Sequence, residues 1–181
     1  KKTMSIADFD NAPIEWKWSG TRVVVMRGVP GSGKSTTASK YASKALEHNV
    51  MFEGRAIVVS ADKFFCDPET LGDYNWDGKH IKCAHQMCKH QFMQALRDKT
   101  WLIIVDNTNT QRWEYRFYCD QAEKFGAELQ VLEVTCGSHP ALALAKFHLR
   151  QKHGVPLEKI IEMEGRWEDD NRAIKIRPWF E

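Results

Sequence analysis

The stretch VVVMRGVPGSGKSTT, residues 23–37, decides how the whole chain is interpreted. An apolar run of four residues leads into a loop with glycine at positions 28, 31 and 33, followed by a lysine and three hydroxyl side chains. The apolar run is typical of a buried strand, and residues 34–48 carry a helical pattern. A tight turn needs one or two glycines, so three glycines beside a lysine indicate a loop whose backbone N–H groups surround an anion.

Residues 28–35 match the P-loop pattern of glycine, four residues, and then Gly-Lys-Ser/Thr, in the strand–loop–helix context that the pattern requires. Lys34 is expected to bridge the β- and γ-phosphates of ATP, and the Ser35 hydroxyl to bind Mg²⁺. The positive N-terminal end of the following helix favours the same anion. The residues expected to bind ATP are Gly28, Pro30, Gly31, Ser32, Gly33, Lys34, Ser35 and Thr36.

The composition is that of an ordinary globular domain. The chain has 181 residues, of which 43% are hydrophobic and 28% charged, and its net charge of +2 neither demands nor excludes a polyanionic partner. Five cysteines without a compact spacing pattern indicate reduced thiols, so we expect an intracellular protein, cytoplasmic or nuclear. No apolar run approaches the roughly 20 residues that span a bilayer, so no membrane partner is expected. The chain does not begin with Met, which suggests a piece of a longer protein with other domains.

Short apolar runs alternate with helical patterns along the chain. The expected strands are continuous apolar runs at residues 21–28, 55–60, 101–106 and 128–135. Helical patterns occupy residues 34–48, 79–98, 111–125, 139–154 and 156–170. This alternation predicts an α/β fold, with a parallel sheet of four to five strands flanked by helices. The last two helical segments, about residues 140–168, are expected to form a C-terminal lid.

Two aspartates end neighbouring apolar runs, where open α/β sheets bind their ligands. Asp62 could accept the proton of an attacking hydroxyl, or could instead cap a helix or turn, and Lys63 beside it could hold an anionic substrate. Asp106 occupies a Walker B-like position, where it would support Mg²⁺. The three residues after it could contact substrate or simply form turns and caps; they are Asn107, Thr108 and Asn109.

Basic residues precede a glycine break in the segment HLRQKHGVP. Arg150 could reach over the phosphates and stabilise charge in the transition state, with Lys146 one helical turn earlier on the same face. Basic side chains also complement the dipole at the end of a helix, so a purely structural role stays open.

Histidines and cysteines are frequent in residues 80–90, but the spaced pairs point in different directions around a helix and form no set of four zinc ligands. Cys83 and Cys88 are therefore expected in the core or at its boundary, with the histidines lining a groove. The nearby Tyr74 and Trp76 could stack on unpaired bases or pack against a lid. Trp113 and Trp167 are expected in the core.

Four segments in this order, GVPGSGKST, SADKFF, VDNTN and RQKHGVP, resemble the P-loop polynucleotide 5′-hydroxyl kinases, a family that includes the bacteriophage enzyme and a kinase-like module of ubiquitin-ligase-binding eukaryotic proteins. The resemblance covers about residues 22–167. It implies a P-loop kinase fold at residues 21–181 behind an N-terminal extension at residues 1–20. It also implies ATP and Mg²⁺ as cofactors and a 5′ end of RNA or DNA as substrate.

The resemblance implies that Asp62 is the general base and Arg150 the lid arginine that clamps the phosphates. Two positions depart from the family pattern: Phe65 replaces an arginine that contacts the substrate phosphate, and Lys146 replaces a second lid arginine. The expected activity is an ATP-dependent polynucleotide 5′-hydroxyl kinase. A kinase for a small molecule or nucleotide sugar, and a non-catalytic ATP-binding interaction module, are the alternatives.

Overall fold

The computed structural model describes residues 18–48, 55–66, 75–135 and 140–177. Within these ranges, five strands form one parallel sheet in the order β2-β3-β1-β4-β5. The strands are β1 (Arg22–Arg27), β2 (Ala56–Val59), β3 (Leu102–Asp106), β4 (Glu128–Val134) and β5 (Ile174–Ile176). All of them run in the same direction, so their carboxyl ends meet at one edge of the sheet.

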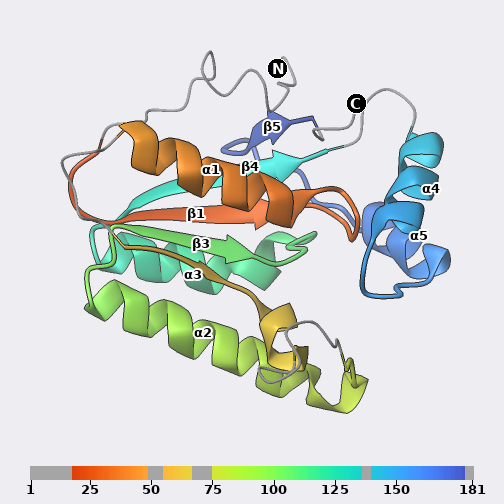
Figure 1. Cartoon of the computed structure of the whole chain (residues 1–181), viewed down its shortest axis with the longest axis horizontal. Helices are drawn as coiled ribbons and strands as arrows, with labels where there is room; N and C mark the ends of the chain where they lie inside the picture. The colour runs from red at the N-terminus through yellow and green to blue at the C-terminus, as the bar shows by residue number, and fades with distance from the viewer. Residues whose placement is uncertain (1–17, 49–54, 67–74, 136–139, 178–181) are drawn as a thin grey trace.

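Helices cover both faces of the sheet, and a separate helix pair stands beyond its carboxyl edge (Figure 1). On one face lies α1 (Lys34–His48), and on the other lie α2 (Ile81–Arg97) and α3 (Arg112–Lys124). Two short 3₁₀ helices, η2 (Ala61–Phe65) and η3 (Gly78–His80), connect β2 to α2. The pair beyond the edge is α4 (Pro140–Arg150) and α5 (Leu157–Gly165), the expected lid.

The core consists of two layers separated by the sheet. In β1, Val24 and Met26 pack toward α1, whereas Val23 and Val25 pack toward α2 and α3. Because both faces are covered, every residue of β1 and β3 is buried, which explains why these strands are continuous apolar runs in the sequence. The predicted α/β fold with a parallel sheet and flanking helices is confirmed.

Several local predictions need correction. Trp113 is not in the core: its side chain is 69% exposed, because Tyr115, Tyr118 and the following buried residues define the opposite side of α3. Cys83 is exposed, whereas Cys88 is buried as expected. The two lid helices end at Arg150 and Gly165, earlier than their helical patterns suggested.

The other aromatic predictions have mixed outcomes. Trp167 is half-buried and packs against an apolar cluster formed mainly by α4 and α5, and Trp76 is exposed. Tyr74 lies outside the described residues. Among the described helices, none combines the length and the hydropathy needed to cross a bilayer.

Candidate active site

The loop between β1 and α1 closes tightly on itself. Gly28 and Gly31 are the positions where glycine is required: a Cβ on Gly28 would lie 2.6 Å from the Ser32 hydroxyl, and Gly31 has φ +77°. The Ser32 side chain is buried, and its hydroxyl has no hydrogen-bond partner in the described part of the protein. An unsatisfied buried hydroxyl costs free energy, and a bound phosphate oxygen would satisfy it.

The predicted ATP-binding residues all lie in this loop or in the first turn of α1. The Lys34 ammonium donates a hydrogen bond of 3.4 Å to the Val29 carbonyl, so it folds over its own loop, where phosphates would bind. The Ser35 and Thr36 side chains are exposed at the start of the helix. The loop therefore presents the donors that a triphosphate requires.

Asp106 ends β3 directly beside the loop. It pairs with Met26 in the register of β1 and β3, two residues before Gly28. Its side chain is buried, and Oδ1 has no hydrogen-bond partner among the described residues. Because a buried carboxylate oxygen is stable only with a donor or a cation, Asp106 fits a role in holding Mg²⁺ together with Ser35.

The segment after Asp106 braces the loop. The Gly28 N–H donates to the Thr108 carbonyl at 2.9 Å, and the Asn109 side chain donates to the Met26 carbonyl at 2.8 Å. The Asn107 amide accepts from the Ala61 N–H at 2.9 Å, which ties β3 to the start of η2. Both asparagine side chains are thus used within the protein, and a substrate role for these three residues stays a prediction.

A buried arginine outside the predicted site residues holds the same region together. Arg27 pairs with Glu133 at 3.0 Å and donates to the Asn109 and Thr110 carbonyls, and its guanidinium lies 4.5 Å from the centre of the Trp167 ring. A buried charge needs such partners to offset its lost hydration. The signal in the sequence was present, since an arginine and a glutamate occur in two apolar strands that pair directly.

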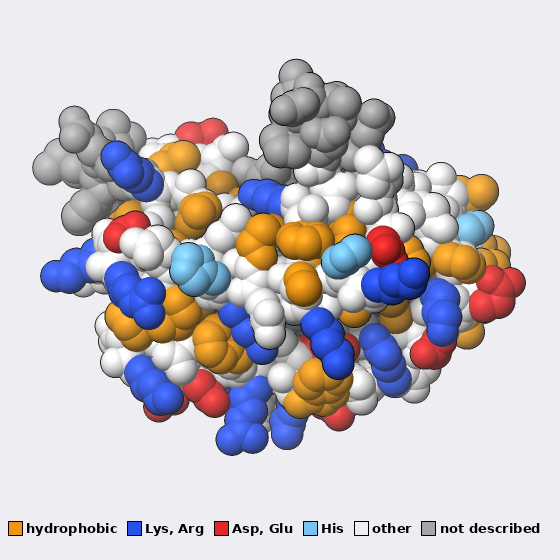
Figure 2. All heavy atoms as spheres, turned by 90° about the horizontal axis from the view of Figure 1, so that it is seen from below, with side chains coloured by type: hydrophobic (Ala, Val, Ile, Leu, Met, Phe, Trp, Pro, Cys, Tyr) orange, Lys and Arg blue, Asp and Glu red, His pale blue; other side chains and the backbone are white. Residues whose placement is uncertain are grey.

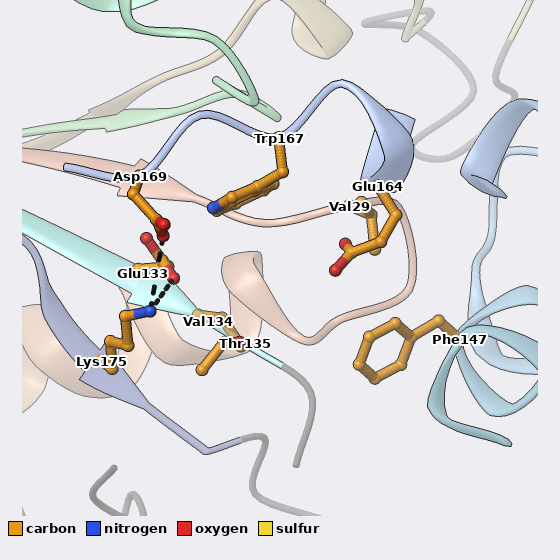
Figure 3. A pocket seen from close by; sticks show the side chains of 9 residues that line it. All are labelled: Val29, Glu133, Val134, Thr135, Phe147, Glu164, Trp167, Asp169 and Lys175. Carbon is orange, nitrogen blue, oxygen red and sulfur yellow. Dashed lines mark ion pairs between the residues drawn. The ribbon is translucent and has the colours of Figure 1, made fainter. Parts of the chain in front are cut away.

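A cavity of about 190 Å³ lies next to this arginine network (Figure 3). Its lining includes Val29 of the loop, but neither Asp62 nor Arg150. Lys175 forms ion pairs with Glu133 and Asp169, while the Glu164 side chain points into the cavity. Burial, followed by the nearby charge of Glu133, raises the pKa of Glu164 above its usual range.

Asp62 stands on η2, just beyond the carboxyl end of β2. The cap of η2 is Ser60, whose hydroxyl accepts from the Asp62 N–H at 3.2 Å, so the carboxylate of Asp62 is not the cap. The Asp62 side chain is 55% exposed, and its Oδ2 lies 3.9 Å from Nε2 of His153 in the lid. The neighbouring Lys63 ammonium turns back to the Val58 carbonyl.

The lid is anchored to the phosphate-binding loop. Val29 packs in an apolar cluster with Phe147 of α4 and Ile160 of α5. Gly31 lies so close to α4 that a Cβ would come within 1.9 Å of the Phe147 carbonyl oxygen. The lid thereby brings His153 to Asp62, whereas Arg150 and Lys146 lie exposed on α4. The His153–Asp62 proximity was not predicted, because it depends on the orientation of the whole lid.

Comparisons with known proteins agree with this geometry. Residues 23–168 match the family AAA_33, described as an AAA domain. Human NEDD4-binding protein 2 is 31% identical over 145 residues, which are 80% of this chain but only 7% of that protein, so the chain spans a small part of this relative.

Two solved structures show the same fold. Kti12 from Chaetomium thermophilum, in complex with ADP-AlF3, has a TM-score of 0.55 at 20% identity, covering 87% of this chain and 89% of that one. A chain of the Pnkp1/Rnl/Hen1 RNA repair complex has a TM-score of 0.52 at 17% identity, covering 88% of this chain and 50% of that one. At these identities, the likeness shows the fold alone.

Proposed function

We propose that this chain, which belongs to the AAA domain family AAA_33, is an ATP-dependent polynucleotide 5′-hydroxyl kinase. Such an enzyme transfers the γ-phosphoryl group of ATP to the 5′-OH end of RNA or DNA. The observation that carries the proposal is the position of Asp62. Its carboxylate lies at the carboxyl edge of the sheet, under the lid, and more than half of its side chain is open to an acceptor. A carboxylate in this place can act as the base for an attacking hydroxyl.

Five residues have separate roles in the proposed reaction. Asp62 accepts the proton of the 5′-OH while the hydroxyl oxygen forms a bond to the γ-phosphorus. The bond from that phosphorus to the β–γ bridging oxygen breaks, and ADP leaves. Lys34 and Arg150 neutralise the charge of the transferred group. Ser35 and Asp106 would hold Mg²⁺, which supplies further positive charge at the β- and γ-phosphates.

The exposure of Asp62 favours the end of a polymer over a small metabolite. Pockets for small ligands bury most of the surface of their ligand, whereas an open carboxylate accommodates a chain end that continues into solvent. Lys63 is adjacent to Asp62 in the chain, and its charge adds positive potential for an anionic substrate. The order of the four sequence motifs, which resembles the polynucleotide kinases, supports the same acceptor.

The test is transfer of labelled γ-phosphate from ATP–Mg²⁺ to a panel of acceptors. We expect product with 5′-OH oligoribonucleotides or oligodeoxynucleotides, and none with the same oligonucleotides bearing a 5′-phosphate. Asp62→Asn should strongly reduce this transfer. Asp120→Asn is the matched control, because Asp120 is an exposed aspartate on α3 that, among the described residues, forms an ion pair with its own helix neighbour Arg116. Transfer to sugars or nucleotide sugars but not to oligonucleotides would refute the proposed acceptor, and ATP binding without transfer to any acceptor would refute the enzyme itself.

A further inference from the structure

One side of α2 carries a row of basic side chains. Lys82, His85 and Lys89 are spaced at i, i+3 and i+7, which places them on one side of the helix. Residues 81–97 contain three lysines and arginines and no acidic residue, so the whole helix is positively charged. Phosphates are attracted to such a row.

Contacts place this row at the seam between α2 and α3. The Lys89 ammonium lies 5.0 Å from the centre of the Phe117 ring of α3. His85 is close enough to Asp62 of η2 and to Glu114 of α3 for both carboxylates to influence it. Partial burial, followed by the charge of Lys89, lowers the pKa of His85 below its usual range.

An exposed aromatic side chain borders the same seam. Trp113 lies one helical turn before Phe117, on the same side of α3, and its indole N–H donates to the Gln111 side chain at 3.2 Å. This bond orients the ring while leaving most of its surface open to solvent. An oriented, exposed tryptophan beside lysines is suited to stacking on a base of a nucleic acid.

Two acidic groups described near the seam have partners. Glu114 forms an ion pair with Arg166 at 3.4 Å, and Asp77 lies 3.3 Å from His80. These two carboxylates, among the residues that the structure describes, therefore do not oppose the lysines as unpaired charges. Figure 2 shows the face that includes α2, where lysine and arginine side chains are spread around histidines and exposed hydrophobic side chains.

We propose that a single-stranded polynucleotide runs along the seam between α2 and α3, with phosphates on Lys82 and Lys89 and a base stacked on Trp113. This path rests on the proposed function, because it assumes that the 5′ end of the strand lies at Asp62. The row from Lys82 to Lys89 spans about 10 Å at the rise of an α-helix, a distance that about two nucleotides of an extended single strand can cover. A single strand fits better than a duplex, because stacking on Trp113 requires an unpaired base.

Binding of 5′-OH oligonucleotides labelled with a fluorophore at the 3′ end tests the path without requiring catalysis. Fluorescence anisotropy should show affinity rising up to a length of about four nucleotides and little beyond it. A plot of log K against log salt concentration has a negative slope, and Lys82→Gln and Lys89→Gln should each make that slope less steep by about 0.7. Trp113→Ala should weaken binding by about five- to tenfold, and this loss should disappear on an abasic oligonucleotide.

Control variants come from the far end of α3. Lys124→Gln and Phe125→Ala remove an exposed cation and an exposed aromatic ring that lie outside the seam, and both should bind as the wild type does. Equal affinities for wild type, Lys89→Gln and Trp113→Ala would overturn the path. Equal binding of a poly-glutamate of matched charge would also overturn it, because the row would then attract anions without recognising a nucleic acid.

A second readout separates the path from the proposed function. In the transfer assay, Lys89→Gln and Trp113→Ala should raise KM for an eight-nucleotide acceptor and leave kcat unchanged. Transfer with unchanged KM in both variants would refute the path and leave the kinase standing. Binding with the expected variant losses, but without phosphate transfer, would support the seam as a strand-binding surface and refute the kinase.

Discussion

The contact between Gly31 and α4 predicts a specific cost for one added methyl group. Gly31 has φ +77°, and its Cβ in Gly31→Ala would lie 1.9 Å from the Phe147 carbonyl oxygen, although ordinary contact begins at 3.4 Å. The left-handed backbone alone costs a non-glycine residue about 1–2 kcal/mol. The clash is with backbone, so rotation of a side chain cannot relieve it, and the loop and α4 must separate.

The separation should weaken the apolar cluster that anchors the lid. Phe147 is fully buried in that cluster, and burial of such a side chain stabilises by about 1.5–3 kcal/mol. Partial loss of this burial should add about 1–2 kcal/mol to the backbone cost. We therefore expect Gly31→Ala to lower the free energy of unfolding by about 2–4 kcal/mol.

Gly126→Ala is the matched control. Gly126 also has a left-handed backbone, with φ +66°, but a Cβ there would meet nothing within 4 Å. It should lose only the backbone part, about 1–2 kcal/mol, when both variants are unfolded in urea. Trypsin should also cleave the lid faster in Gly31→Ala, at its exposed residues Lys146, Arg150 and Lys152. Equal stability losses in the two variants, with equal cleavage of the lid, would refute the anchoring of the lid by the loop.

Three further predictions concern buried or partnered charges. Glu133→Gln should lower the free energy of unfolding by about 3–5 kcal/mol, because it leaves the Arg27 charge buried without its carboxylate; a urea titration showing a loss below 1 kcal/mol would contradict this. Hydrogen bonds from Arg172 hold the pKa of Asp170 below its usual range, so the stability that this carboxylate contributes is fully present above its unfolded pKa, about 3.9, and declines progressively as the pH falls below that value toward the folded pKa. The difference in Tm between wild type and Asp170→Asn should thus shrink from pH 7 to pH 3, and a constant difference would oppose the assignment. Asp106→Asn should raise the Mg²⁺ concentration needed for half-maximal transfer by roughly tenfold or more, measured by magnesium titration at saturating ATP, whereas an unchanged requirement would argue against Asp106 as a metal-supporting residue.

Features with local physical causes could be predicted from the sequence. The loop at residues 28–35 follows from glycine, lysine and hydroxyl spacing, and β1 and β3 follow from apolar runs buried on both faces. The exposed position of Trp113 could also have been found, since the buried residues of α3 recur at helical spacing on another side. The residue type points the other way, because tryptophan is on average a highly buried side chain.

Features that depend on distant contacts could not be predicted. The strand β5 has three residues, too few for a recognisable pattern, and its place beside β4 depends on packing after the lid. The proximity of His153 and Asp62 arises only when α4 is anchored on Val29 and Gly31. The seam between α2 and α3 likewise joins residues from two helices whose relative rotation no single segment determines.

The most direct test of the account is the rate of γ-phosphate transfer from ATP to a 5′-OH single-stranded oligonucleotide, measured for wild type and Asp62→Asn at saturating ATP, with ATP affinity measured alongside. Removal of a general base typically slows the chemical step by about 10²–10⁴-fold, so transfer should fall by that factor while ATP affinity stays unchanged. Transfer at the wild-type rate in Asp62→Asn would contradict the assignment of Asp62 as the base.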